Sequence, residues 1–260
     1  MSNVSISTSN LCIGYRTQKL EIRVQTDLTF SLNAGEMVCM LGPNGCGKST
    51  LLRTLAGLQP ALAGEFSIHN SEVRQNAKDI ALVLTERLSM DNTTVHDVVA
   101  MGRYPYTSFM GGLTAEDEAI IAEAIEQVGF TLTTQDSILL TTPFNVHSDG
   151  EKQRILIAKA LAQQTPVILL DEPTAHLDLP HRILVLRLLR QLAHEQGKTV
   201  LISTHELDLA LALSDRILLM TPGKGVQLDT AEHLRKIDAF TSAFGMDIFN
   251  PLGVSYTRSA

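Results

Sequence analysis

Short apolar runs alternate with amphipathic stretches along much of the chain, and this pattern predicts strands separated by helices. The apolar runs are Met37–Leu41, Ile80–Leu84, Val167–Leu170, Thr199–Ser203 and Ile217–Met220. Between the third and fourth runs, leucines and isoleucine recur at mostly helical spacing from Ile183 to Leu192, with Pro180 as the first helical residue and Gly197 as the stop. Strands that alternate with helices favour an α/β fold with a mainly parallel sheet.

A different pattern covers about residues 91–163, where we find helical signals and no convincing strand. Thr114–Asp117 resembles a capping box that opens a helix ending at Gly129, and a second helix is expected from near Ser148 to about Gln163. We therefore expect a helical subdomain inserted into one domain that spans residues 1–260. Residues 1–36 hold short strand-like runs, typical of an antiparallel β flap, and the tail after Asp229 begins as helix and then becomes irregular.

Composition places the chain among ordinary globular proteins. A hydrophobic share of 44% and a charged share of 19% exclude collagen-like, disulfide-rich and disordered classes. The net charge of −7 argues against a broad nucleic-acid footprint. The three cysteines follow no metal or disulfide spacing, which fits a reducing cytoplasm. We see no signal peptide and no apolar run near the ~20 residues that span a bilayer, so the chain is not expected to cross a membrane by itself.

A glycine-rich turn follows the first apolar run and matches the phosphate-loop pattern G-x-x-x-x-G-K-[ST]. Its residues are Gly42, Pro43, Asn44, Gly45, Cys46, Gly47, Lys48 and Ser49. Glycines let successive N–H groups face one anion, helped by the N-terminus of the following helix. The pattern predicts that Lys48 reaches the β- and γ-phosphates of a nucleotide and that Ser49 ligates Mg²⁺. We also expect the amides and Lys48 to favour the Cys46 thiolate, within the nucleotide site.

Two adjacent carboxylates, Asp171 and Glu172, follow the apolar run Val167–Leu170. The first is suited to Mg²⁺ and the second to a base that activates water. His205 ends the next strand one helix later, so we expect it to lie beside Glu172, near a γ-phosphate.

Ser148-Asp149-Gly150-Glu151 has two interpretations that do not exclude each other. As S-x-x-E it is a capping box, and as a glycine-containing helix start it is a site for an anion. Lys48 and Ser148 are far apart in sequence and both suit a phosphate. Two such sites and one nucleotide suggest a second copy of the chain.

These motifs together resemble the ATP-binding-cassette (ABC) ATPases over about residues 10–225. Five segments match motifs of that family in order and spacing. Gly42–Thr50 matches its P-loop, Ser148–Arg154 its signature, Leu169–Thr174 its Walker B motif, Ala175–Asp178 its D-loop and His205 its switch histidine. Within the family, Val98–Pro105 and Leu113–Asp117 are similar to the importers of iron–siderophore, haem and cobalamin complexes.

The resemblance implies a P-loop ATPase core that binds ATP and Mg²⁺. Tyr15 would stack on adenine, Thr50 would belong to the nucleotide site, and Ser148, Gly150 and Glu151 would meet the nucleotide held by a second copy. Asp171 would hold the metal with Ser49, Glu172 would act as general base, and His205 would hold the γ-phosphate.

The sequence departs from the family's pattern in two places. The signature, usually Leu-Ser-Gly-Gly-Gln/Glu, has His147 at its first position and Asp149 at its third, which adds a negative charge near a phosphate. The usual Q-loop glutamine is absent, because Thr85 and Glu86 follow the run Ile80–Leu84. We expect one of these two to serve at the metal, with Glu86 having the reach and a hard oxygen ligand.

As a whole, the sequence resembles the ATPase subunit of an importer for an iron chelate or cobalamin. The resemblance implies a head-to-tail dimer of this chain, a membrane permease docked on the helical insert, an indirect link to a substrate-binding protein, and a peripheral location on the cytoplasmic face of the membrane. Two alternatives remain: an ABC ATPase that acts on nucleic acid or ribosomes, and a P-loop small-molecule kinase. The first requires a very long coiled-coil insert or two cassettes, and the second requires neither Ser148–Arg154 nor His205.

Overall fold

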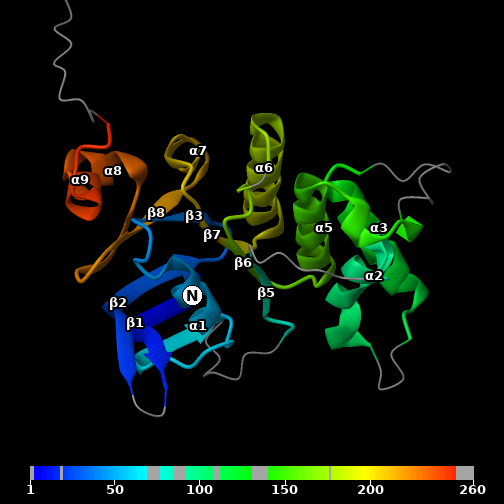
Figure 1. Cartoon of the computed structure of the whole chain (residues 1–260), viewed down its shortest axis with the longest axis horizontal. Helices are drawn as coiled ribbons and strands as arrows, with labels where there is room; N and C mark the ends of the chain where they lie inside the picture. Colours follow the sequence, from blue (N-terminus) through cyan, green and yellow to red (C-terminus); the bar gives the residue numbers. More distant parts are fainter. Residues whose placement is uncertain are drawn as a thin grey trace, which may run out of the picture.

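The protein folds into two β-sheets with helices packed around them (Figure 1). The structure is a computed structural model that describes residues 3–17, 20–68, 77–84, 92–107, 112–130, 140–175 and 177–249. One sheet has six strands in the order β5-β6-β7-β3-β8-β9, and the other has three strands in the order β2-β1-β4.

The six-stranded sheet is parallel except at one edge, which confirms the predicted mainly parallel sheet. Its strands are β3 (Met37–Leu41), β5 (Ile80–Val83), β6 (Val167–Asp171), β7 (Thr199–Ser203), β8 (Arg216–Thr221) and β9 (Gly225–Asp229). Only β9 is antiparallel to its neighbour, β8. The central strand β3 pairs with both β7 and β8. Every residue of β3, β6 and β7 is buried, because helices or the second sheet cover both faces.

The smaller sheet is antiparallel, as predicted for the N-terminal residues, but its strands are long rather than short. β1 (Val4–Arg16) and β2 (Glu21–Asn33) each have 13 residues, and β4 (Ala63–Ile68) completes the sheet. The pairing of β1 with β2 shifts register at several points, and Asn10 and Asp27 have positive φ of 46° and 58° beside two of them. These bulges interrupt the alternation of apolar and polar residues, so the sequence reads as several short runs.

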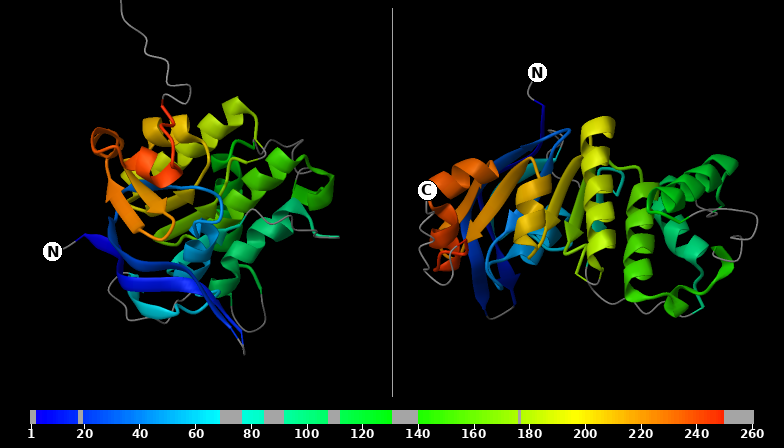
Figure 2. Two further views of the ribbon diagram at one scale, coloured as in Figure 1. Left: turned by 60° about the vertical axis from the view of Figure 1, so that its left-hand side comes forward. Right: turned by 90° about the horizontal axis from the view of Figure 1, so that it is seen from above.

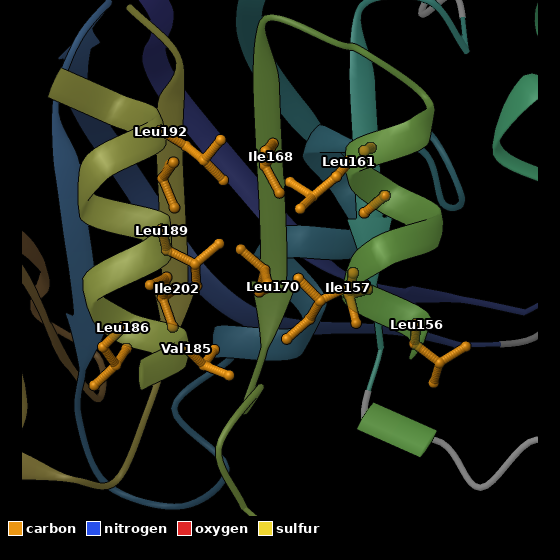
Figure 3. Close-up of a cluster of buried hydrophobic side chains, with 14 of the residues drawn as sticks. Leu156, Ile157, Leu161, Ile168, Leu170, Val185, Leu186, Leu189, Leu192 and Ile202 are labelled. Carbon is orange, nitrogen blue, oxygen red and sulfur yellow. The ribbon is translucent and has the colours of Figure 1, made fainter. Parts of the chain in front are cut away.

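The sheet divides the core into two apolar layers. Alternate residues of β3 face opposite sides: Met37 and Cys39 pack in one layer, Val38 and Met40 in the other. The first layer includes apolar residues of α5 (Asp149–Ala162) and α6 (Leu179–Gln196), and Figure 3 shows their side chains beside Ile168, Leu170 and Ile202. The second layer lies between the six-stranded sheet, α1 (Lys48–Leu55) and the antiparallel sheet.

The helices of the α/β core agree with their sequence signals, except the helix Leu207–Leu213, which the sequence did not predict. They are α1 (Lys48–Leu55), α6 (Leu179–Gln196), α7 (Leu207–Leu213), α8 (Ala231–Lys236) and α9 (Ala239–Phe244). Helix α6 begins one residue before Pro180 because Asp178 caps it, and it stops at Gly197, whose φ is 67°. Residues beyond 249 lie outside the described part of the chain.

A group of helices lies at one end of the molecule, far from the C-terminal helices (Figure 2). Its helices within the described residues are α2 (Val95–Ala100), α3 (Ala115–Gln127), α5 (Asp149–Ala162) and the 3-10 helices η1 (Met101–Tyr106) and η2 (Phe144–Val146). The predicted capping box at Thr114 is present, and α5 has the one predicted at Ser148. The described residues between β5 and β6 form no strand, only an isolated bridge between Thr94 and Pro143. That residues 91–163 form one inserted subdomain stays a prediction.

Asp117 has a second role besides capping α3, because it also receives a buried hydrogen bond from Arg103 at 2.8 Å. The backbone N–H of Thr114, followed by the side chain of Arg103, lowers the pKa of Asp117 to about 2. This pair ties η1 to α3.

No helix in the described ranges is both long and apolar enough to span a bilayer.

Candidate functional site

The loop between β3 and α1 is shaped by glycines. Gly42, Gly45 and Gly47 have φ of 155°, 76° and 102°. A Cβ on Gly42 would lie 2.5 Å from the carbonyl oxygen of Met220, and one on Gly47 would lie 2.9 Å from Val24 Cγ1. Only glycine fits these positions, so the loop can pass close to β8 and β2 and turn sharply into α1.

The start of α1 suits an anion. Its N-cap is Gly47, which offers no side chain to the first amides of the helix. Lys48 is buried, and its Nζ donates to the carbonyl oxygens of Gly42 at 2.8 Å and Pro43 at 3.3 Å. Pro43 O also accepts from the N–H of Cys46 at 3.3 Å, which closes the turn around Asn44 and Gly45. The lysine ammonium therefore lies against the loop that the sequence assigns to phosphate.

Tyr15 lies beside the start of α1. Its hydroxyl and that of Thr50 are 3.0 Å apart, which joins β1 to the helix that follows the phosphate loop. The tyrosine is 48% exposed, so a large part of its surface remains open to solvent. Tyr15 is thus next to the candidate site, and its stacking on adenine stays a prediction.

The expectation of a reactive Cys46 is wrong. Its side chain is 2% exposed and packs in the apolar layer between the two sheets. A Cβ on Gly42 would lie 2.8 Å from its Sγ, so the sulfur lies under the loop. Burial raises the pKa of the Cys46 thiol and outweighs the opposing effect of Lys48. The Cys46 side chain therefore packs as a small apolar group beneath the phosphate loop, and the place of this residue in the nucleotide site stays a prediction.

The two strand-end carboxylates are fixed by the neighbouring strand β7. Asp171 is buried, and the hydroxyl of Ser203 donates to its Oδ1 at 2.5 Å. The N–H of Glu172 lies 3.0 Å from the same hydroxyl oxygen and 3.1 Å from the carbonyl oxygen of Ser203. Glu172 has a positive φ of 46°, which is uncommon for a residue other than glycine. The two contacts with Ser203 hold the backbone of Glu172 in this conformation.

Glu172 and His205 meet as expected. His205 Nε2 lies 2.5 Å from Glu172 Oε1. The two residues follow adjacent parallel strands, β6 and β7, and both side chains are partly exposed. The carboxyl ends of parallel strands share one edge of the sheet, where β3 also delivers the phosphate loop. The proximity predicted from strand order is therefore confirmed, and the catalytic roles remain predictions.

The capping box before α5 is complete. The N–H and hydroxyl of Ser148 donate to Glu151 Oε2 at 2.9 and 2.7 Å, and the N–H of Glu151 donates to Ser148 Oγ at 3.3 Å. The pKa of Glu151 is lowered, and the hydrogen bond from the Ser148 hydroxyl is the largest cause. A cavity of about 490 Å³ lies in front of this turn, lined by Ser148, Asp149, Gly150, Glu151, Arg154, Leu177, Asp178 and His181. These residues lie at the N-terminal ends of α5 and α6 or just before them, and none of them belongs to the phosphate loop.

Two of the four residues expected to contact Mg²⁺ lie among the described residues, namely Ser49 and Asp171. Ser49 and Asp171 supply a hydroxyl and a carboxylate oxygen, the hard ligands that this ion prefers. In the part of the chain that the structure covers, no three His, Cys, Asp or Glu residues form a metal-binding group. Thr85 and Glu86, the candidates for the missing glutamine, lie outside the described residues.

Comparison with known proteins identifies the family. The model of the ABC transporter family matches residues 25–175, and the chain belongs to that family. The ATP-binding proteins of the ABC transporter family hydrolyse ATP. The chain is therefore an ATPase that binds this nucleotide. The prediction of a P-loop ABC core is confirmed.

Two relatives and one structure indicate the branch of the family. The iron(3+)-hydroxamate import ATP-binding protein of Bacillus subtilis is 36% identical, covering 94% of this chain and 88% of its own length. The hemin import ATP-binding protein of Streptomyces coelicolor is 41% identical, covering 74% and 68%. A structure described as a metal-chelate type ABC transporter in an inward-facing conformation is 30% identical with a TM-score of 0.79, covering 94% of this chain and 90% of that one.

Two residues near the site were not found from the sequence. Ser203 ends an apolar strand, and the alignment of β6 with β7 would have placed it beside Asp171. Gln25 lies in β2, and its Nε2 donates to the carbonyl oxygen of Thr221 at 2.9 Å while its Cγ lies close to Gly47. Its only sequence signal is a glutamine at a position of β2 that faces inward. The bulges of β2 hide the alternation of apolar and polar residues that would have revealed this position.

Proposed function

We propose that this chain is the ATP-hydrolysing subunit of an importer that carries an iron chelate, with haem and cobalamin as the related cargoes. The observation that carries the catalytic part is the contact between Glu172 and His205 at the ends of β6 and β7, the second of which pairs with the strand that leads into the phosphate loop. The names of the relatives support the transport part.

Hydrolysis is assigned to the chain's own residues as follows. Glu172 accepts a proton from water as the water oxygen attacks the γ-phosphorus and the bond to the bridging oxygen breaks, a role worth ~10²–10⁴-fold. Lys48 and the amides at the start of α1 hold the β- and γ-phosphates. His205 holds the γ-phosphate while its contact with Glu172 orients the base. Tyr15 lies where it can stack on the adenine.

Ser49 and Asp171 are the residues that would hold Mg²⁺. When bound, the ion supplies positive charge that neutralises phosphate oxygens. The hydrogen bond from Ser203 to Asp171 keeps that carboxylate at the strand end.

A complete site requires two copies of the chain. Among the described residues, the lining of the cavity before α5 comes from the N-terminal ends of α5 and α6 and the residues just before them, which supports a nucleotide delivered by another molecule. We propose a head-to-tail dimer in which each ATP lies between Lys48 of one copy and Ser148, Gly150 and Glu151 of the other. Two exposed apolar residues near this cavity, Val146 and Leu179, support burial of this face in a dimer.

The closing and opening of this dimer would drive a membrane permease. We propose that residues 91–163 form the helical subdomain on which the permease docks, supported by the exposed side chain of Tyr104 on η1. The chain would then lie on the cytoplasmic face of the membrane, peripheral to it, and a substrate-binding protein would present the cargo on the other side.

The experiment that tests the function is reconstitution with a membrane permease from the same organism that binds this chain. ATP hydrolysis is measured in proteoliposomes while a binding protein presents a ferric hydroxamate, haem or cobalamin. Stimulation by a ferric hydroxamate is expected, and stimulation by haem or cobalamin alone would move the assignment to that cargo. Stimulation by nucleic acid or ribosomes, or transfer of phosphate to a small-molecule acceptor, would contradict a role in transport.

A further inference from the structure

Arg182, near the start of α6, contacts two separate loops at the edge of the sheet where β6 and β7 end. Its Nε donates to the carbonyl oxygen of Leu177 at 2.7 Å, and its Nη1 is paired with Glu206 Oε1. Both side chains of this ion pair are 29% exposed, so most of each is shielded from water. Since the guanidinium is rigid and planar, an arginine that uses two of its N–H groups on two partners also fixes how those partners lie relative to each other.

The two loops that Arg182 contacts also carry the proposed catalytic pair. Glu172 begins the loop that leads to Leu177, and His205 directly precedes Glu206. The contact between Glu172 and His205 therefore joins the two loops at one point, and Arg182 joins them at a second point. Two connections leave one loop little freedom to move relative to the other.

The segment between Glu172 and Leu177 transmits the position of one residue to the other. The N–H of Ala175 donates to the carbonyl oxygen of Glu172 at 3.2 Å, and the N–H of Leu177 donates to that of Thr174 at 3.1 Å. The side chain of Leu177 is buried in the apolar layer that contains α5 and α6. A shift of Leu177 would therefore also displace Glu172.

On the other loop, the side chain of Glu206 serves Arg182 rather than its own helix. Glu206 is the N-cap of α7, a position where a side chain commonly accepts from an amide of the helix, yet it makes no such hydrogen bond. Its N–H donates to the hydroxyl of Thr204 at 3.0 Å, and the N–H of Thr204 donates to the carbonyl oxygen of Met40 at 3.2 Å. The turn that carries His205 is thus held to β3 by its backbone and to α6 by this ion pair.

We propose that Arg182 is a positioning residue for hydrolysis. It holds the two loops together, so that His205 keeps Glu172 in the orientation in which the carboxylate accepts a proton from water. The inference rests on the proposed roles of Glu172 and His205. Because Leu177 and Glu206 lie outside the phosphate loop, the affinity of that loop for ATP should not depend on Arg182.

The test measures ATP hydrolysis against ATP concentration for Arg182→Gln, Glu206→Gln and the double variant. Each single change should lower kcat by roughly ten- to a hundredfold with KM unchanged, because a small displacement of a positioned base is costly. The double variant should be no slower than the slower single variant, since both changes break the same contact. The matched control is Arg187→Gln, which removes the same charge from an exposed position of α6 and should hydrolyse at the parent rate.

A second background separates positioning from a general effect on the structure. In Glu172→Gln, the further change Arg182→Gln should slow the residual single-turnover hydrolysis no more, because the base that Arg182 positions has already been removed. The melting temperature and the binding of a fluorescent ATP analogue are measured for every variant, and rates are compared well below the lowest melting temperature.

The outcomes distinguish the inference from the proposed function. An unchanged kcat for Arg182→Gln, together with slow hydrolysis by Glu172→Gln, would overturn the inference and leave the base in place. A raised KM at constant kcat, or equal slowing in both backgrounds, would also overturn it, because Arg182 would then support ATP binding or the fold as a whole. Turnover of Glu172→Gln at the parent rate would instead overturn the proposed base itself.

Discussion

At the scale of single residues, one serine organises the acidic end of β6. Ser203 contacts the carboxylate of Asp171 through its hydroxyl and the backbone N–H of Glu172 through both its hydroxyl and its carbonyl oxygen. The backbone of Glu172 is therefore held in a left-handed conformation while its side chain remains partly exposed beside His205. A fixed backbone with a partly exposed carboxylate, oriented by a neighbouring side chain, is what a positioned base requires.

Replacing Glu172 by glutamine keeps the shape of the side chain and removes its basicity. Glu172→Gln should bind ATP normally and release phosphate roughly 10²- to 10⁴-fold more slowly. Phosphate release and binding of a fluorescent ATP analogue measure the two steps separately. Asp208→Asn, which changes an exposed acid on α7, is the control and should hydrolyse at the parent rate. Near-normal turnover of Glu172→Gln would refute the assignment.

The thiols of this chain should react slowly in the folded state. Cys12, Cys39 and Cys46 are all buried, and burial raises the pKa of Cys39 to about 12 and also raises that of Cys46. Since the thiolate is the reactive form, maleimide should label the native chain far more slowly at neutral pH than the chain unfolded in guanidinium. Mass spectrometry of timed samples gives both rates. Rapid labelling of Cys46 that ATP prevents would show that its thiol lines the nucleotide site after all.

At the scale of elements, α6 illustrates how both ends of a helix are fixed by local chemistry. Asp178 accepts from the N–H of His181 at its start, and Gly197 adopts φ of 67° at its end. Its buried leucines then face β6 and β7 across the core (Figure 3).

The end of α6 gives a clean test of backbone conformation. Gly197 has open space around the position of a Cβ, so an alanine there meets no clash and only the left-handed φ is penalised. Gly197→Ala should lower the free energy of unfolding by about 1 kcal/mol. Gly112→Ala, also in open space but without a positive φ, should be close to neutral in the same chemical denaturation experiment. Equal stability of the two variants would mean that the backbone at the C-terminal end of α6 can adopt another conformation without loss of free energy.

The elements that the sequence predicted well are those whose burial is uniform. Strands β3, β6 and β7 are buried on both faces and stand out as apolar runs. The length of β1 and β2 was missed because their bulges break the alternation, and α7 was missed because Leu207–Leu213 is too short and evenly apolar to show helical spacing. In the site, strand order placed His205 beside Glu172, whereas the burial of Cys46 depends on β8 passing beneath the loop, which no local pattern reports.

At the scale of the whole molecule, the two groups of residues suited to phosphate lie on separate elements. The phosphate loop joins β3 to α1 in the α/β core, whereas Ser148 caps α5, which packs against α2 and α3. In the head-to-tail dimer proposed above, each group would meet the nucleotide held by the other copy, so the dimer would contain two equivalent composite sites.

Mixing two inactive variants tests this geometry. Lys48→Ala and Ser148→Arg should each abolish hydrolysis, but a mixed dimer contains one site with an intact lysine and an intact serine. An equal mixture should recover about a quarter of the parent activity, since half of the dimers are mixed and one of their two sites works. Lys48→Ala mixed with Glu172→Gln is the control, because both changes lie in the same half of a site and recovery is not expected. Recovery in both mixtures, or in neither, would exclude this pairing of sites.

The position of β3 at the centre of the sheet also bears on how the chain folds as it is synthesised. The antiparallel sheet has all its strands once Ile68 has been made, since Ile6 pairs with Ile68. β3 has to wait for the last part of the chain, because Met37 pairs with Val200 and Val38 with Arg216. Pairings so distant in sequence carry a large cost of loop closure and form slowly. The strand that delivers the phosphate loop is therefore flanked by its partners only near the end of translation, and nucleotide binding can report completion of the fold.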